Sequence, residues 1–277
     1  MKSLKYFAAL STAVLTAVSC GPKKADAPKV LVLYYSQTAT TKTVAEEIAN
    51  RLDADIEEIV PVKPYDGTYE ETIARGVEER SQGIHPEIQP LKSDLSAYDV
   101  VFLGYPIWFG TFAPPVGTFL EQADLSGKKV VPFCTFGSGG LVSSVRDLKE
   151  KQPDAEVLPG YGVRQARIDA VVGEVDRFLK ANGFLEGEYT PLEEFPEAHE
   201  ATEEEAAVFD AAVGDYPMIH AKAKAVSSRS IPGGVEYLFT AVDIPREDAP
   251  GMMPERELKV YVTVEEGKEP VFTQVVR

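Results

Sequence analysis

The sequence VLVLYY at residues 30–35 is followed at once by SQTATT at residues 36–41 and by an amphipathic stretch over 44–52. A short continuous run of β-branched and aromatic residues is typical of a strand buried on both faces of a parallel sheet. The apolar residues of the third stretch recur at helical spacing. This order of strand, hydroxyl-rich turn and helix predicts the first unit of an α/β fold.

The same pattern continues along the chain to residue 184. Four further strands are expected, at 54–60, 100–105, 130–135 and 156–161. Each of these strands is expected to be followed by a helix, at 66–82, 112–122, 141–151 and 166–182. Pro132 lies inside the fourth strand, where it lacks a ladder donor, and predicts a bulge there. Five strands alternating with helices predict an α/β fold over 29–184, a parallel three-layer sandwich with right-handed crossovers.

Three loops of this predicted sheet have distinctive chemistry, and each follows the carboxyl end of a strand, where open α/β sheets bind ligands. The first loop, 36–41, carries four hydroxyls and opens a helix, whose N-terminus offers unpaired N–H groups to a phosphate. The alternative is ordinary helix capping by Ser and Thr. The loop lacks the Lys and the glycines of a Walker motif, which argues against hydrolysis of nucleotide triphosphates.

The second and third loops combine aromatic residues with glycine. The second, PIWFGT at 106–111, holds the chain's only Trp, and the third, TFGSGG at 135–140, has three glycines in four positions. Aromatic rings at a strand mouth suit stacking on a flat ligand, and glycines allow backbone amides to approach a ring edge. The alternatives are rings that merely cover the core and a flexible turn.

Together and in this order, the three loops resemble those of the flavodoxin family. YYSQTATTK at 34–42 matches the family's Ser/Thr-x-Thr-Gly-x-Thr phosphate loop, and the other two loops match the pair that brackets the isoalloxazine ring. Ala39 stands where glycine is usual, which matters if the loop requires a positive φ there. The resemblance covers residues 29–184 and implies a flavodoxin-like fold with strand order 2-1-3-4-5 and bound FMN.

The resemblance also implies a cofactor site and a role. The expected phosphate contacts are Ser36, Gln37, Thr38, Ala39, Thr40 and Thr41. One side of the flavin is expected to be lined by Pro106, Ile107, Trp108, Phe109, Gly110 and Thr111, and the other by Thr135, Phe136, Gly137, Ser138 and Gly139. Gly110 is the expected peptide partner of flavin N5. FMN itself would supply the chemistry, so no catalytic residue is expected.

Three functions remain open at this point. The first is electron transfer between protein partners. The second is an FMN-dependent oxidoreductase of the NAD(P)H:quinone type, acting on a small-molecule acceptor. The third is a non-enzymatic binding protein whose flavin site is empty.

Residues 185–277 predict a second unit. An acidic linker with two prolines, 185–201, leads to a helix that begins with Thr202 as its cap, and four strands follow at 219–230, 235–242, 258–264 and 271–276. This α+β unit, 202–277, resembles the cystatin fold. The inhibitor family's Gln-x-Val-x-Gly hairpin is replaced by SIPGG at 230–234, which argues against protease inhibition and favours a docking module for a redox partner.

The N-terminus predicts export. Residues 1–19 combine Lys2 and Lys5 with an apolar run that is too short to span a bilayer. The sequence AVSCG at 17–21 resembles the lipobox of bacterial lipoproteins, which implies cleavage before Cys20, lipidation of Cys20 and a tether over 20–28. The expected location is therefore a bacterial membrane, on its periplasmic side, with an ordinary secretory signal or an uncleaved anchor as alternatives.

Composition excludes several classes. The chain has 277 residues, 44% of them hydrophobic and 26% charged, as in a globular protein. Its 44 acidic and 28 basic residues give a net charge of −16, which argues against nucleic-acid binding and favours partners with basic surfaces. Two cysteines provide no disulfide framework. The three histidines lack metal-ligand spacing, so no metal is expected.

Overall fold

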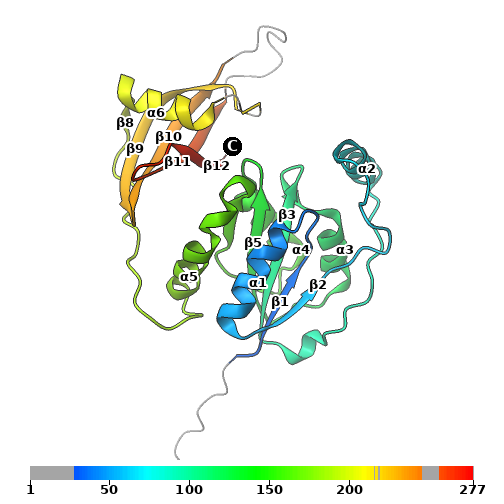
Figure 1. The fold of residues 1–277 in the computed structure, drawn as a ribbon. Coiled ribbons are helices and arrows are strands. Elements are labelled where there is room, and N and C mark those ends of the chain that lie inside the picture. Colours follow the sequence, from blue (N-terminus) through cyan, green and yellow to red (C-terminus); the bar gives the residue numbers. More distant parts are fainter. Residues whose placement is uncertain (1–27, 215, 218, 245–255, 277) are drawn as a thin grey trace, which may run out of the picture.

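The protein consists of an α/β unit and a smaller α+β unit (Figure 1). The structure, a computed structural model, describes residues 28–214, 216–217, 219–244 and 256–276. The expected lipoprotein signal, Cys20 and nearly all of the tether lie outside the described residues. Within the described part of the chain, no helix is both long and apolar enough to cross a membrane.

A parallel sheet forms the centre of the α/β unit. Its strands are β1 (Val30–Tyr34), β2 (Asp55–Glu58), β3 (Val100–Trp108), β5 (Lys129–Phe136), β6 (Glu156–Val157) and β7 (Tyr161–Arg164). The order is β2-β1-β3-β5, and both β6 and β7 pair with β5, all in parallel. This arrangement confirms the expected order, since β6 and β7 together take the place of the fifth strand.

The irregularity expected at Pro132 occurs on the neighbouring strand instead. Pro132 pairs with Leu103 in an unbroken ladder between β3 and β5. On the other side of β5, Val130 pairs with Val157 and Phe133 with Tyr161, so two residues of β5 face three residues of the fifth strand. The fifth strand is therefore divided into β6 and β7 opposite the residue that lacks a donor.

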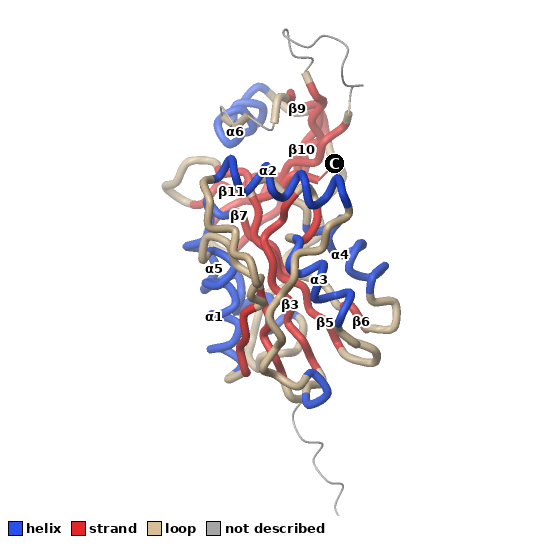
Figure 2. Tube along the Cα trace, turned by 90° about the vertical axis from the view of Figure 1, so that its right-hand side faces the viewer, coloured by secondary structure: helices blue, strands red, loops and turns tan. Residues whose placement is uncertain are grey.

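Helices cover both faces of this sheet (Figure 2). On one face lie α1 (Thr40–Leu52) and α5 (Val171–Ala181), which pack on Val32, Phe102 and Val131. On the other lie α3 (Pro114–Gln122) and α4 (Leu141–Lys151), which pack on the alternate residues of the same strands, such as Leu33 and Leu103. Both faces are therefore apolar, as the continuous hydrophobic runs predict.

Helix α2 (Tyr69–Gln82) lies beside the upper end of the sheet, where Gly76 contacts the Phe109 ring, and not on one of the sheet's faces (Figures 1 and 2). Thr68 begins it with a capping box, in which its hydroxyl accepts from Glu71 N–H and its N–H donates to the Glu71 carboxylate. Gly83 ends it with a φ of 64°, in the left-handed region.

The second unit is an antiparallel sheet with one helix, α6 (Glu203–Val213). Its strands follow the order β12-β11-β10-β9-β8, with β8 (His199–Glu200), β9 (Ala221–Ile231), β10 (Gly234–Asp243), β11 (Glu257–Glu265) and β12 (Val271–Val276). Phe209 of α6 packs edgewise on Phe239 of β10, with 5.3 Å between ring centroids. The antiparallel sheet is thereby confirmed, and β8 shows that the expected linker contributes a short edge strand.

Candidate functional site

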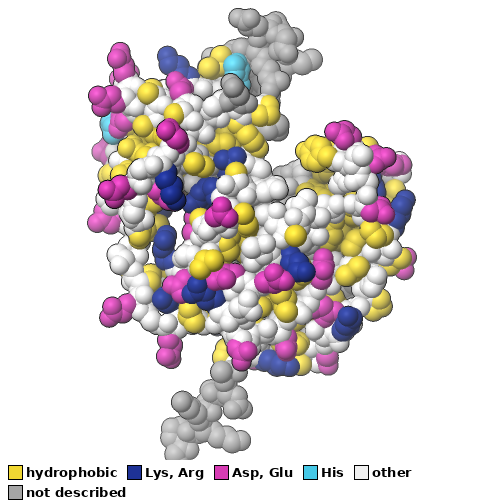
Figure 3. Space-filling view, viewed as in Figure 1, with side chains coloured by type: hydrophobic (Ala, Val, Ile, Leu, Met, Phe, Trp, Pro, Cys, Tyr) yellow, Lys and Arg dark blue, Asp and Glu magenta, His cyan; other side chains and the backbone are white. Residues whose placement is uncertain are grey.

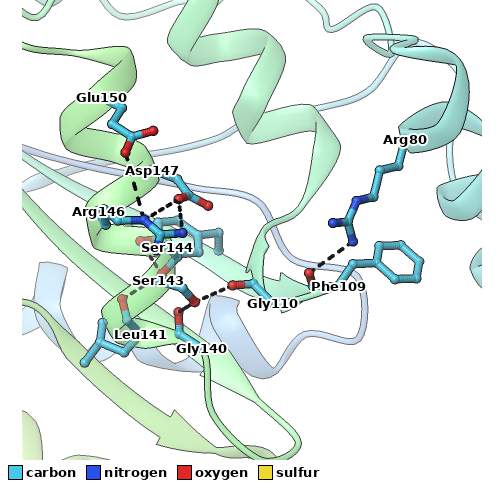
Figure 4. A network of polar contacts seen from close by, with 11 residues as sticks. Arg80, Phe109, Gly110, Gly140, Leu141, Ser143, Ser144, Arg146, Asp147 and Glu150 are labelled. Atoms are coloured by element: carbon cyan, nitrogen blue, oxygen red, sulfur yellow. Dashed lines mark hydrogen bonds and ion pairs between the residues drawn. The ribbon is translucent and has the colours of Figure 1, made fainter. Parts of the chain in front are cut away.

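The three loops meet at the upper rim of the parallel sheet and are tied to one another. The hydroxyls of Thr41 and Thr135 lie 2.8 Å apart, which joins the first loop to the third. Ser143 Oγ lies 2.5 Å from the Gly110 carbonyl and 3.1 Å from the Gly140 carbonyl, which joins the second loop to the third (Figure 4). The rim is thus a single connected structure.

The first loop has the geometry of an anion site. Ala39 has a φ of 63°, so the loop does adopt the positive φ that glycine usually supplies. Its turn opens α1, whose first N–H groups have no intrahelical partner, and Ala39 provides no side-chain cap. Thr38 and Thr40 are hydrogen bonded at 3.1 Å, and Ser36 Oγ accepts from Lys42 N–H at 3.2 Å. Hydroxyls and backbone donors therefore cluster at a helix N-terminus.

Two of the predicted phosphate contacts face inward. Thr41 is 1% exposed and its hydroxyl bonds to that of Thr135, which is also buried. The Tyr35 hydroxyl donates to the amide oxygen of Gln37 at 2.6 Å, and the amide nitrogen of Gln37 donates to the Tyr65 carbonyl. These two side chains stabilise the loop and do not present their polar atoms at the rim.

The second loop is a tight hairpin, which corrects the expected start of the following helix. Ile107 pairs with Phe112 and Trp108 with Thr111, so the strand β4 (Thr111–Phe112) replaces the first residue of the expected 112–122 helix. The turn residues are Phe109 and Gly110, with φ of 52° and 86°. Positive φ at both central residues is the requirement of a type I′ hairpin, whose twist matches that of the strands.

The aromatic rings of the second loop contact α2 and two tyrosines. Trp108 packs edgewise on Tyr65 and Tyr35, with centroids 5.1 and 6.2 Å away. The Phe109 ring lies against Gly76, where a β-carbon would come within 2.9 Å of it, and Arg80 donates to the Phe109 carbonyl at 3.2 Å (Figure 4). Trp108 is partly buried and packs against the core, whereas Phe109 is 37% exposed. The two rings therefore cover the edge of the core and also lie next to the rim.

The third loop differs from the prediction at Phe136. This side chain is 4% exposed and packs in the core, close to Gly162 of β7, so only its backbone is available to a ligand. Gly137, Ser138 and Gly139 follow the strand and lie at the rim. Gly140 has a φ of 118° and a β-carbon on it would come within 2.5 Å of Ile107. Glycine at 140 thus lets the second and third loops touch.

One polar atom at the rim has no partner. Thr111 Oγ1 is buried, and it alone among the buried side-chain nitrogen and oxygen atoms of the described residues makes no hydrogen bond. Buried hydroxyls are almost always paired, because an unpaired one costs about 1–3 kcal/mol. A ligand with a polar edge at the rim would satisfy Thr111, so the residues present fit a flavin.

Several rim residues escape recognition from the sequence. Tyr65 donates to Glu79 at 2.6 Å, and Arg75 binds the same carboxylate at 2.7 Å, so α2 is tied to the loop that holds Gln37. Burial raises the pKa of Tyr65 well above its usual range, and the hydrogen bond to Glu79 raises it further. Ser143 and Arg164 also lie at the rim. None of these residues belongs to a sequence motif, so the sequence alone does not identify them.

Cys134 is a structural residue of the hydrophobic core. Cys134 is fully buried in β5, and burial raises the pKa of its thiol far above the ordinary value. The carboxylate, histidine and cysteine side chains of the described ranges form no group of three or more that could hold a metal ion.

The α/β unit was compared with known protein families and proteins. The flavodoxin family matches residues 29–174. The NAD(P)H dehydrogenase (quinone) of Gluconacetobacter diazotrophicus is 30% identical over 163 residues, which cover 52% of this chain and 78% of that protein.

Two solved structures are also similar. A candidate flavoprotein from Bacteroides eggerthii is 33% identical, covers 54% of this chain and 97% of its own, and gives a TM-score of 0.48. The flavoprotein of Lactobacillus acidophilus in complex with FMN is 29% identical, covers 54% of this chain and 97% of its own, and gives a TM-score of 0.46. The family match spans more than half of the chain, and the chain therefore belongs to the flavodoxin family.

Proposed function

We propose that the rim of the parallel sheet binds FMN and that the protein transfers electrons. The observation that carries the proposal is the buried, unpaired Thr111 hydroxyl at a rim where three loops are tied together beside the N-terminus of α1. FMN supplies reversible electron transfer when it is bound, and the protein supplies its position and electrostatic surroundings.

The residues divide into two groups by their chemistry. The hydroxyls of Ser36, Thr38 and Thr40, with the first N–H groups of α1, suit a phosphate because the helix end adds partial positive charge. Thr111 and the backbone of the third loop offer polar groups to the edge of a flat ring. Trp108 excludes water from this side of the rim, since it is held edgewise by Tyr35 and Tyr65.

The same proposal extends to partners and location. The net charge of −16 favours redox proteins with basic surfaces, which it would attract at low salt. The lipobox-like sequence before Cys20 supports a lipid anchor in a bacterial membrane with the protein facing the periplasm. The cystatin-like sequence pattern of the C-terminal unit supports a docking role for that unit.

An absorption spectrum tests the central proposal. The purified full chain should carry the flavin bands, or acquire them with quenching of flavin fluorescence when FMN is added. Protein that stays colourless after incubation with FMN and dialysis would contradict it. Riboflavin, which lacks the phosphate, should bind much more weakly if the first loop holds that group.

A second candidate function is reduction of a small acceptor. It is favoured by the relative named NAD(P)H dehydrogenase (quinone), which is 30% identical to this chain over 163 residues. The surface is also hollowed between α2 and the C-terminal unit, above the rim (Figure 3). Steady oxidation of NADPH by the purified protein in the presence of a quinone, with no other protein, would distinguish this function from electron transfer between proteins.

A further inference from the structure

The C-terminal unit touches the third loop of the rim directly. Val275 of β12 donates its N–H to the Ser138 carbonyl at 2.7 Å. A β-carbon on Gly139 would lie 2.2 Å from the Val275 carbonyl oxygen, so the two backbones are in contact. Because β12 is the edge strand of its sheet, its outer backbone groups are available for this contact.

Arg164 forms the second connection between the units. Its Nε donates to the Gly137 carbonyl at 2.8 Å, and one terminal nitrogen donates to the Phe272 carbonyl, also at 2.8 Å. The guanidinium lies 3.4 Å from the centroid of the Phe272 ring and 5.4 Å from that of Tyr216. Arg164 is 9% exposed, and within the described ranges its hydrogen bonds go to backbone carbonyls and not to a carboxylate. The planar guanidinium, which presents several donors in a fixed geometry, therefore holds the third loop against β12.

These contacts fix two consecutive peptides of the third loop. The peptide that contains the Gly137 carbonyl also contains the N–H of Ser138, and the peptide of the Ser138 carbonyl contains the N–H of Gly139. All peptides in the described part are trans, so each N–H points away from its own carbonyl. Anchoring both carbonyls on Arg164 and β12 therefore directs both N–H groups away from these partners. Neither N–H donates to another backbone group of the described residues.

We propose that the C-terminal unit completes the flavin site, because β12 and Arg164 hold the Gly-rich loop with its Ser138 and Gly139 N–H groups presented to the acceptor edge of the flavin ring. This inference rests on the proposed binding of FMN. It assigns the C-terminal unit a structural role in the cofactor site, in which Arg164 is a positioning residue. Without the anchor, the glycines of the loop would leave these peptides free to rotate.

Variants at the two anchors test the inference in the full chain. Arg164→Met keeps the length and apolar contacts of the side chain but removes both hydrogen bonds. Val275→Pro removes the N–H that Ser138 accepts, at an edge position where proline is tolerated. Both should weaken FMN binding about tenfold or more, measured by quenching of flavin fluorescence.

Arg229→Met is the matched control. Arg229 also lies over a ring, 4.3 Å from the centroid of Phe195, and donates to a backbone carbonyl, that of Glu193, at 2.9 Å. It lies in the C-terminal sheet, where it also pairs with Glu236 at 2.7 Å, and within the described ranges it donates no hydrogen bond to the third loop. We expect wild-type affinity for FMN in this variant, whereas a loss equal to that of Arg164→Met would overturn the specific role of Arg164.

Hydrogen exchange gives a test that needs no variant. If the anchored loop binds FMN more tightly than the free loop, FMN must in turn strengthen the anchor. The amide of Val275 should therefore exchange at least severalfold more slowly when FMN is added to the wild-type chain. An unchanged exchange rate, or unchanged affinity in both anchor variants, would overturn the inference while FMN binding itself stood. Failure of the wild-type chain to bind FMN would overturn the proposed function, and the inference with it.

Discussion

Thr41 Oγ1 and Thr135 Oγ1 lie 2.8 Å apart in the interior, 94 residues from each other in sequence. Thr41 stands in the first turn of α1 and Thr135 near the end of β5. Their hydrogen bond joins the first loop of the rim to the Gly-rich third loop. Both hydroxyls are satisfied by it, although neither reaches solvent.

Breaking this pair on one side should destabilise the protein more than removing it altogether. Thr135→Val leaves the Thr41 hydroxyl buried without a partner, which should lower the free energy of unfolding by about 1–3 kcal/mol. The double variant Thr41→Val, Thr135→Val should lose less than the sum of the two single variants, because no unpaired hydroxyl remains. Urea unfolding of the FMN-free protein measures all three. Additive losses would show that the two hydroxyls act independently.

The left-handed backbone at Ala39 makes a stabilising substitution available. With a φ of 63°, an alanine is strained by roughly 1–2 kcal/mol, and glycine is not. Ala39→Gly should therefore raise the free energy of unfolding by up to about 1 kcal/mol, since the greater chain entropy of glycine offsets part of the gain. Ala49→Gly, within the helical part of α1, is the control and should lower it by about 1 kcal/mol. Equal losses in both variants would contradict the strain at residue 39.

The buried tyrosines predict a loss of stability at high pH. Burial raises the pKa of Tyr34 to about 12, helped by Glu58 and Glu46, from about 10 in an unfolded chain. Burial raises the pKa of Tyr161 further, as do the neighbouring charges and hydrogen bond of Glu174. Above pH 10, and up to the raised pKa in the folded protein, the unfolded state loses tyrosine protons that the folded state keeps. The free energy of unfolding is therefore unaffected by these groups below pH 10 and falls above it.

Tyrosine ionisation, followed by ultraviolet absorbance alongside circular dichroism, measures this effect. A fraction of the tyrosines should ionise only as the fold is lost, at a pH well above 10. Tyr34→Phe should reduce the slope of stability against pH between 10 and 12. Complete ionisation near pH 10 in a protein that keeps its native dichroism would show that these side chains are accessible.

The strands and the three loops are predictable from sequence because their signals are local. The buried runs at 30–35 and 100–105 need no partner to be recognised, and the loops follow them directly. The hairpin at Trp108–Thr111 is different, because its pairing depends on two residues with positive φ, one of them Phe109, which no propensity favours. The helix start expected at 112 was wrong for this reason.

Contacts between distant segments account for the rest of what the sequence leaves open. Arg164 acquires its role from Gly137 and Phe272, which lie 27 and 108 residues away. Tyr65 joins the rim through Glu79 on α2, and no periodicity in the sequence reveals that this helix lies beside the end of the sheet. A polar residue that serves as a clamp between units looks, in the sequence, like any other polar residue.

The unpaired hydroxyl of Thr111 predicts opposite effects on stability and on binding. Thr111→Val preserves shape and removes a buried oxygen that has no partner, so the FMN-free protein should be as stable as the wild type or more stable by about 1 kcal/mol. If the flavin provides the missing partner, the same variant should bind FMN about tenfold more weakly. Stability is measured by urea unfolding and affinity by quenching of flavin fluorescence.

Thr118→Val is the matched control for this experiment, because the Thr118 hydroxyl is also buried but donates to the Pro86 carbonyl at 2.8 Å. Thr118 lies in α3, away from the three loops. Its replacement should therefore lower the free energy of unfolding by about 1 kcal/mol and leave the affinity for FMN unchanged. Thr111→Val should thus lower the affinity for FMN without lowering stability, and Thr118→Val should lower stability without lowering the affinity. A Thr111→Val protein that loses stability without losing affinity would show that its hydroxyl has a partner within the protein, and the case for a ligand at the rim would lose its principal support.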